Sequence, residues 1–147
     1  MTASRPAPGR SAAQLNYRMS PENTDCLVEA DIDCCVLANN HVLDWGSAGL
    51  SETLEVLRRR GLQAAGLGRN AAEAAAPAIL DVAGKGRVIV LSFAAASSGT
   101  PRDWAATAAQ PGVNLTELSA SAVETIGKQI ERIQRPRDVV IASTPQT

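Results

Sequence analysis

A short apolar run, a polar loop and an amphipathic helix follow one another early in this chain. Residues 32–37 read Ile-Asp-Cys-Cys-Val-Leu, which is typical of a strand covered on both faces. Residues 47–60 then place Leu50, Leu54 and Leu57 on one helical face, and Gly61 is the expected C-terminal stop. A strand that runs through a tight loop into a helix is the repeating unit of α/β proteins. This order therefore restricts the fold class more than any other feature of the sequence.

The rest of the chain continues the alternation. A helix is predicted from Ser20-Pro21-Glu22, with a hydroxyl cap and a proline in the first turn, to Ala30. The further predicted elements are a strand at 62–66, a helix capped by Asn70, strands at 78–82 and 87–93 around a Gly-Lys-Gly hairpin turn, a helix at 119–134 and a strand at 138–143. Residues 94–117 are predicted to be a long irregular segment. The pattern predicts an α/β fold, a three-layer α/β sandwich.

Composition excludes several classes of protein. The chain is 45% hydrophobic but only 3% aromatic, so its core has to be built from aliphatic side chains. Its 14 basic residues balance 15 acidic ones, and this argues against a nucleic-acid partner. No stretch approaches the roughly 18 apolar residues that span a membrane. Residues 1–14 are predicted to be a disordered lead-in without an apolar signal core.

The three cysteines make no even-numbered disulfide framework. Cys26, Cys34 and Cys35 are all predicted to be buried thiols in a reducing compartment, and a metal-binding role is the weaker alternative. The expected location is therefore cytoplasmic.

Residues 38–46 gather chemically active side chains in the loop after the first predicted strand. Asn39 and Asn40 precede His41, which is the single imidazole in the chain, and Asp44 follows. In open α/β sheets, ligands sit at the loops that follow the strands. Amide oxygens and imidazole nitrogens bind metals, and a carboxylate commonly orients a metal-binding histidine, as Asp44 would orient His41. From the loop alone, a capping or packing role is an open alternative, and Asn39 could hold the loop backbone.

The sequence of this loop resembles the CapA family of poly-gamma-glutamate capsule synthesis proteins. The resemblance is carried by residues 37–46, 49–54 and 66–70, with an Asn-Asn-His-x-x-Asp-x-Gly core, and it extends from about Leu15 to Ser143. That family shares the fold of calcineurin-like metallophosphoesterases. The resemblance therefore implies a partial three-layer α/β sandwich of the metallophosphoesterase type over residues 15–147, lacking outer strands.

The resemblance also implies roles for individual residues. Asn40 would bind a metal, and His41 would act as the acid near the leaving oxygen or as an outer metal ligand. Asp44 would orient His41, while Asn39 and Arg69 would contact substrate. The cofactors implied for intact members are divalent ions (Mn, Mg, Fe or Zn), and the implied substrate is an anionic polymer or a phosphoester.

The chain departs from the family pattern in ways that argue against catalysis. The early Gly-Asp motif, the later His-Trp-Gly motif and a further histidine-rich loop are absent, and a two-metal centre needs ligands from several strands. We therefore expect a fragment of a capsule synthesis protein with weak or absent metal binding. Strand edges left unpaired would favour self-association.

Two other functions are alternatives. The first is a small non-catalytic α/β binding or scaffold module. The second is a nucleotide-binding domain that uses residues 66–71, Gly-Leu-Gly-Arg-Asn-Ala. Because the third glycine of a dinucleotide fingerprint is replaced by Ala71, a tight turn before a capped helix is the better interpretation of that segment.

Overall fold

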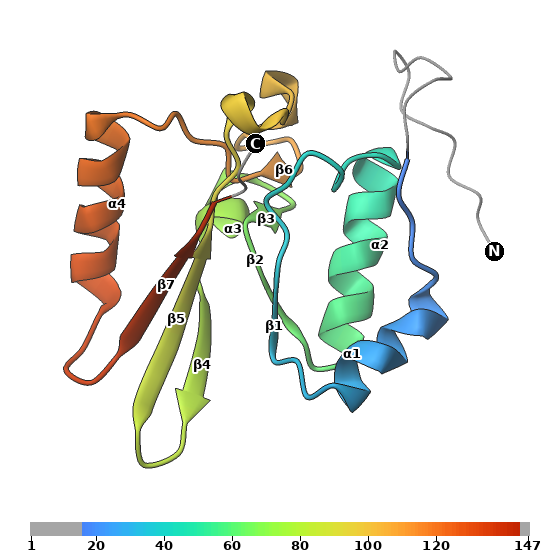
Figure 1. Ribbon diagram of the computed structural model, residues 1–147. Coiled ribbons are helices and arrows are strands. Elements are labelled where there is room, and N and C mark those ends of the chain that lie inside the picture. Colours follow the sequence, from blue (N-terminus) through green and yellow to red (C-terminus); the bar gives the residue numbers. More distant parts are fainter. Residues whose placement is uncertain (1–15, 145–147) are drawn as a thin grey trace.

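The computed structural model describes residues 16–144 as an arrangement of strands and helices (Figure 1). The helices are α1 (Asp25–Glu29), α2 (Gly46–Arg59), α3 (Ala71–Ala75) and α4 (Ala120–Ile133). The strands are β1 (Cys34–Val36), β2 (Gln63–Ala65), β3 (Leu67–Gly68), β4 (Ala78–Val82), β5 (Gly86–Ser92), β6 (Gly112–Val113) and β7 (Val139–Ser143). The fold is α/β, which confirms the predicted class. The predicted lead-in at 1–14 lies outside the described residues.

The strands form three small sheets within the described part of the chain. β1 runs parallel to β2, and β3 runs antiparallel to β6. β5 is paired on one side with β4, antiparallel, and on the other with β7, parallel. The β4–β5 pairing confirms the hairpin predicted around residues 84–86. The long segment 94–117 is less irregular than predicted, because it contains β6 and two 3-10 turns, Ala96–Ser98 and Arg102–Trp104.

The carboxyl ends of β1, β2 and β5 meet beneath the loop at 38–46. The Leu37 amide donates to the Ala65 carbonyl (2.9 Å), and the Ala38 amide donates to the Ser92 hydroxyl (3.4 Å). Gly66 allows this approach, because a Cβ at that position would lie 2.7 Å from both the Ala38 and the Ser92 Cβ atoms. Its positive φ of +94° also favours glycine. The packing therefore places the Asn-Asn-His loop at the edge where strand ends converge.

The main core lies directly under that loop. Leu50 of α2 is fully buried, and it belongs to a cluster with Ala38, Leu43, Leu67, Ala94, Trp104 and Val113. As the composition indicated, this core is mostly aliphatic. Ala38 and Leu43 flank His41 in sequence, so the same contacts that stabilise the fold also fix the loop.

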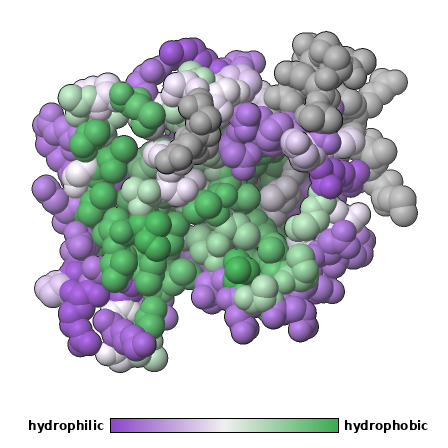
Figure 2. Space-filling model, in the orientation of Figure 1, coloured by the Kyte–Doolittle hydropathy of each residue, from purple (hydrophilic) through white to green (hydrophobic). Residues whose placement is uncertain are grey.

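One face of the molecule is apolar and exposed (Figure 2). Val36 of β1 is 46% exposed, Ile141 of β7 is 47% exposed and Val123 of α4 is 69% exposed. α4 has no buried residue. The prediction that the first strand is covered on both faces is wrong at its end, where Val36 is exposed, although Cys34 packs against the cluster of Ala65, Ala78 and Val90. The prediction of three buried thiols is wrong for Cys26, which is exposed on α1, and Cys34 and Cys35 are only partly buried.

Helix caps agree with the sequence in part. The Asn70 side chain accepts a hydrogen bond from the Glu73 amide (3.0 Å), as predicted for the start of α3. Ser119 caps α4 in the same way, through the Ala122 amide (3.2 Å). Ser20 was predicted to cap with its hydroxyl, but its carbonyl is used instead and accepts from the Asn23 amide. A 3-10 turn at Pro21–Thr24 therefore precedes α1.

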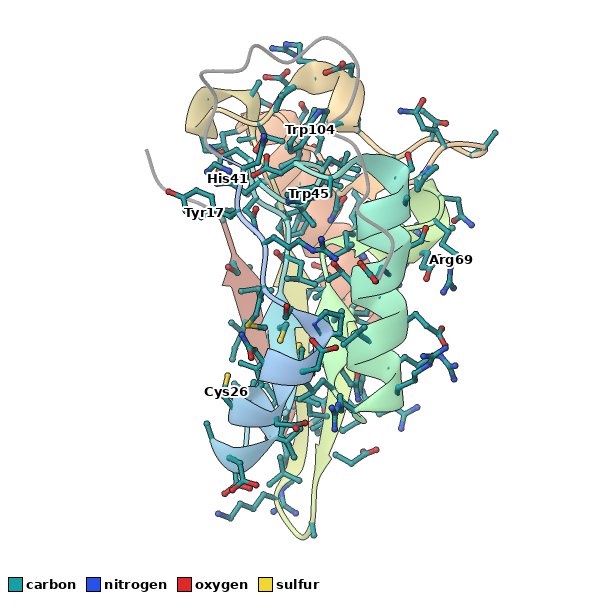
Figure 3. All side chains as sticks on the ribbon, turned by 90° about the vertical axis from the view of Figure 1, so that its right-hand side faces the viewer. Tyr17, Cys26, His41, Trp45, Arg69 and Trp104 are labelled. Carbon is teal, nitrogen blue, oxygen red and sulfur yellow. The ribbon has the colours of Figure 1, made fainter. Side chains whose placement is uncertain are left out.

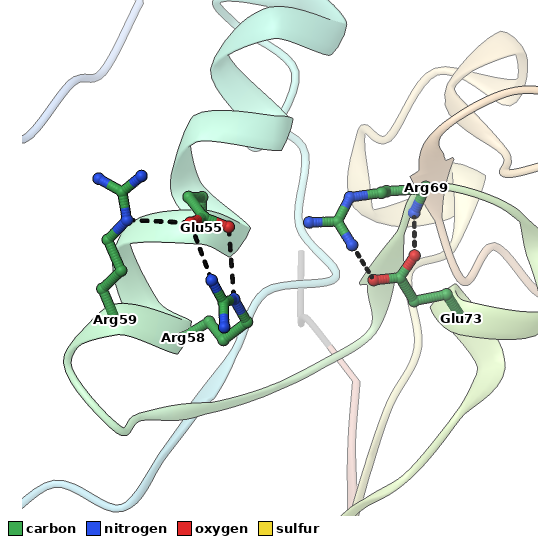
Figure 4. A network of polar contacts seen from close by, with 5 residues as sticks. All are labelled: Glu55, Arg58, Arg59, Arg69 and Glu73. Carbon is green, nitrogen blue, oxygen red and sulfur yellow. Dashed lines mark hydrogen bonds and ion pairs between the residues drawn. The ribbon is translucent and has the colours of Figure 1, made fainter.

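The arginines at the end of α2 are held by acidic neighbours (Figure 4). Arg58 and Arg59 both donate to the Glu55 carboxylate, and these hydrogen bonds lower the pKa of Glu55. Arg60 pairs with Asp25 of α1 at 2.6 Å. These contacts agree with a solvated cationic helix end that complements the helix dipole.

No helix among residues 16–144 is both long and apolar enough to cross a bilayer.

A nearly buried ion pair ties the start of β5 to the turn before β7. Arg87 Nε donates to Asp138 Oδ1 (3.2 Å), and the Asp138 side chain is only 3% exposed. Asp138 also accepts from the Arg135 amide (2.8 Å). The hydrogen bonds from Arg87 are the largest cause that lowers the pKa of Asp138 from 3.8 to about 2.

This pair predicts a pH-dependent contribution to stability. Because the folded-state pKa of Asp138 lies below the unfolded one, the contribution is complete above about pH 4 and is lost as pH falls toward 2. We expect Asp138→Asn to lower the melting temperature by roughly 5 °C at pH 7, with the difference from the unaltered chain closing between pH 4 and pH 2. Glu117→Gln, which removes an exposed pair with Arg102, is the matched control and should change the melting temperature by no more than about 1 °C. A difference that persists at pH 2 would contradict the assignment.

Candidate functional site

The loop at 38–46 is a tight turn held by its own polar groups. The Asn39 side-chain oxygen accepts a hydrogen bond from the His41 amide (2.9 Å). The Asp44 amide donates to the His41 carbonyl (3.0 Å), and the Gly46 amide donates to the Leu43 carbonyl (2.9 Å). Asn39 therefore holds the loop backbone, which is the alternative that the sequence left open for it. Its contact with substrate stays a prediction.

His41 and Asp44 form the central pair of the loop. His41 Nδ1 lies 3.0 Å from Asp44 Oδ2, and the carboxylate is fully buried, while the histidine side chain is 39% exposed. This is the contact expected if Asp44 orients the ring. With Nδ1 facing Asp44, the other ring nitrogen, Nε2, is the atom that can contact a ligand.

Tyr17 belongs to this site although the sequence did not single it out. Its backbone amide donates to Asp44 Oδ2 (2.9 Å), the same oxygen that faces His41. Its ring meets the His41 ring edge to face, with centroids 4.5 Å apart, and its carbonyl accepts from Trp45 Nε1 (3.0 Å). Figure 3 shows Tyr17, His41 and Trp45 at the same end of the molecule. The available signal was the rarity of aromatic residues, since Tyr17 is the single tyrosine of the chain.

Asn40 faces the segment that follows β5. A Cβ built on Gly99 would lie 3.3 Å from Asn40 Nδ2, so the amide packs close to this glycine, whose φ is +80°. The neighbouring Thr100 is 2% exposed, and its hydroxyl has no hydrogen-bond partner among the described residues. Two segments far apart in the sequence therefore meet at Asn40.

Arg69 lies elsewhere on the surface. Its amide and its guanidinium both donate to the Glu73 carboxylate, at 2.8 and 3.4 Å (Figure 4). Figure 3 shows it well apart from His41, on the other side of α2 in that view. The structure does not bring Arg69 beside the loop, so its contact with substrate stays a prediction without support from geometry.

Gly66 and Gly68 allow neighbouring segments to pack closely against the backbone. Gly66 lies against Ala38 and Ser92, and a Cβ on Gly68 would lie 2.3 Å from the Ala74 amide nitrogen in α3. α3 itself has only five residues. The segment is therefore a close strand-to-helix turn, in agreement with the interpretation that the sequence favoured over nucleotide binding.

The donors in this loop do not fit a two-metal centre. Within residues 16–144, no three His, Cys, Asp or Glu side chains come together in a way that could hold a metal ion. Asn40 and His41 Nε2 are the donors that the loop offers, whereas Asp44 is already engaged by Tyr17 and His41. Catalytic sites of this kind use about three protein ligands per ion. Burial raises the pKa of both the Cys34 and the Cys35 thiols, so these side chains are not ready thiolate ligands.

Together these features define an α/β protein with an Asn-Asn-His loop at the strand ends. The chain belongs to the bacterial capsule synthesis protein family PGA_cap, whose model matches residues 2–145, and this family is of the metallophosphoesterase type.

Curated relatives agree with this membership. The chain is 40% identical over 129 residues to a probable polyglutamine synthesis accessory protein from Mycobacterium tuberculosis strain H37Rv, covering 86% of this chain, and to its counterpart from strain CDC 1551. It is 39% identical over 108 residues to an uncharacterized protein of Sinorhizobium fredii, covering 70% of this chain and 23% of that protein. The chain spans about a third (34%) of the length of the mycobacterial relatives.

Proposed function

We propose that this chain carries one part of the ligand-binding apparatus of a capsule (poly-gamma-glutamate) synthesis protein and does not hydrolyse phosphoesters by itself. The observation that carries the proposal is the His41–Asp44 pair, in which a buried carboxylate 3.0 Å from Nδ1 leaves Nε2 as the ring nitrogen that can bind a ligand. Asn40 stands next to His41 in the same loop. We call the Asn40 side chain and His41 Nε2 the half-site. It would bind a divalent ion weakly, with water completing the coordination.

The chemistry of the chain supports the negative part of the proposal. A two-metal hydrolytic centre stabilises both the attacking and the leaving oxygen, and this needs carboxylate or histidine ligands from several strands. The sequence has one histidine, and the buried Asp44 is used to position it. In relatives with a full donor set, the substrate would be an anionic polymer or a phosphoester.

The single histidine makes a direct test available. Mn²⁺ is expected to broaden the ring signals of His41 selectively in proton NMR spectra, with half-saturation on the order of 1 mM or weaker, and the effect should disappear in Asn40→Ala. The same preparation should show no turnover of p-nitrophenyl phosphate above the buffer rate. Hydrolysis that is lost in His41→Gln would contradict the claim that the chain is inactive. If Mn²⁺ does not broaden the His41 ring signals, the proposed metal binding by Asn40 and His41 is wrong.

The apolar face favours a second candidate function, a non-catalytic scaffold module that self-associates. β7 ends the β4–β5–β7 sheet, and Val139 and Ile141 are 57% and 47% exposed on it. An uncharged strand at a sheet edge is open to pairing with another chain. We expect the full chain to sediment as a dimer or larger species, and Ile141→Lys to shift it toward the monomer. A chain that is monomeric at roughly 100 μM, well above a micromolar Kd, would contradict this function.

A further inference from the structure

A cavity of about 290 Å³ lies beside the His41 loop. Its walls come from residues 17–24, from β1 with the residues after it, and from α2. Asn39 and His41 line it where β1 runs into the loop, whereas Leu27 and Leu57 line it near α1 and the end of α2. The cavity therefore runs from the half-site down into an apolar interior.

Residues 17–24, which form one wall of the cavity, are held to the His41 loop at Tyr17. The Tyr17 amide donates to the buried Asp44, and the Tyr17 carbonyl accepts from Trp45 Nε1. These two contacts join residues more than 25 positions apart in the sequence. The cavity is therefore preformed at the end that adjoins His41, as ligand pockets usually are.

Charge is present at the mouth of the cavity and scarce inside it. Arg18 lines the mouth and lies 5.2 Å from the centroid of the Trp45 ring. Its carboxylate neighbour, Glu52, is 3.9 Å away, and both side chains are more than a third exposed. An exposed pair at that distance contributes little, so a ligand anion can replace Glu52 beside Arg18 at small cost.

We propose that this cavity binds a compact anion that carries an aromatic or branched apolar group. The apolar group occupies the space between Leu37, Val56 and Leu57, and the anionic head lies against the Arg18 guanidinium. The volume lies at the lower end of the range for ligand pockets, roughly 300–1,000 Å³, so the ligand is small. This goes beyond the metal half-site, because the head is held by a side chain of the protein and needs no ion.

The proposal is tested with three probes at one concentration of full-length chain, in buffer with a chelator. Phenylphosphonate carries both the ring and the anion, methylphosphonate lacks the ring, and benzyl alcohol lacks the anion. We expect phenylphosphonate to bind on the order of tenfold more tightly than either of the other two, measured by calorimetry. Equal affinity for methylphosphonate would overturn the apolar subsite, and equal affinity for benzyl alcohol would overturn the anion subsite.

Variants of the wall complete the test. Val56→Trp fills the cavity and should weaken phenylphosphonate binding by tenfold or more, roughly the contribution of the buried ring. Val123→Trp, on the exposed face of α4, is the matched control and should leave binding unchanged. Thr53→Met fills the same space with a smaller change, and it replaces Val56→Trp if that variant lacks a cooperative melting transition. Arg18→Met should remove the preference for phenylphosphonate over benzyl alcohol. Unchanged binding in the filled variant would refute the site, whatever Mn²⁺ does at His41.

Discussion

Leu50→Ala is expected to lower the free energy of unfolding by about 3–5 kcal/mol. Leu50 is fully buried in the cluster that includes Ala38 and Leu43. Its truncation removes the apolar contacts of the side chain and leaves a cavity that the neighbouring strand ends cannot close. A small domain has only about 5–15 kcal/mol of stability, so this single change could unfold the chain. Urea denaturation followed by circular dichroism measures the difference.

Leu118→Ala provides the comparison at an exposed position. Leu118 is 66% exposed between β6 and α4, and its truncation should change stability by no more than about 0.5 kcal/mol. Because Ala38 and Leu43 flank His41, Leu50→Ala should also weaken the effect of Mn²⁺ on the His41 signals. A loss of stability below about 1 kcal/mol would show that the cluster under the loop is not the main core.

The local elements were predictable because their signals are local. Turn residues predicted the hairpin at 84–86, and Asn70 predicted the start of α3. Helical periodicity predicted α2 to within one residue at each end. The exposure of Val36, Cys26 and α4 was not predictable, because apolar sequence shows only that a surface could be buried. Whether it is buried depends on which other elements pack over it.

The candidate site also contains one contact that the sequence predicted and others that it could not predict. The His41–Asp44 contact follows from a spacing of three residues in one turn, so the sequence alone predicted it. The contacts of Tyr17 with Asp44 and Trp45 join segments 27 and 28 residues apart, and no periodic pattern reports such a contact. For Arg69 the contact that the structure shows is local, with Glu73 four positions away, and the substrate contact that the resemblance implied stays a prediction.

Asp44→Asn is the second change with a large expected effect. The Asp44 side chain is fully buried, and one of its oxygens accepts from the Tyr17 amide while facing His41 Nδ1. Asparagine keeps the shape but removes the charge, and hydrogen bonds to charged groups contribute about 1.5–3 kcal/mol each. We expect the free energy of unfolding at pH 7 to fall by about 2–3 kcal/mol, measured by urea denaturation, and His41 to lose its fixed orientation.

Asp103→Asn separates this effect from a general loss of negative charge. Asp103 is exposed in the 3-10 turn Arg102–Trp104, so its replacement should change stability by no more than about 0.5 kcal/mol and leave the His41 signals unchanged. In Asp44→Asn, by contrast, the ring signals of His41 should shift, and Mn²⁺ should broaden them less at the same concentration. A stable variant with unchanged His41 signals would mean that the Tyr17 contact and loop packing, rather than the carboxylate, orient the imidazole.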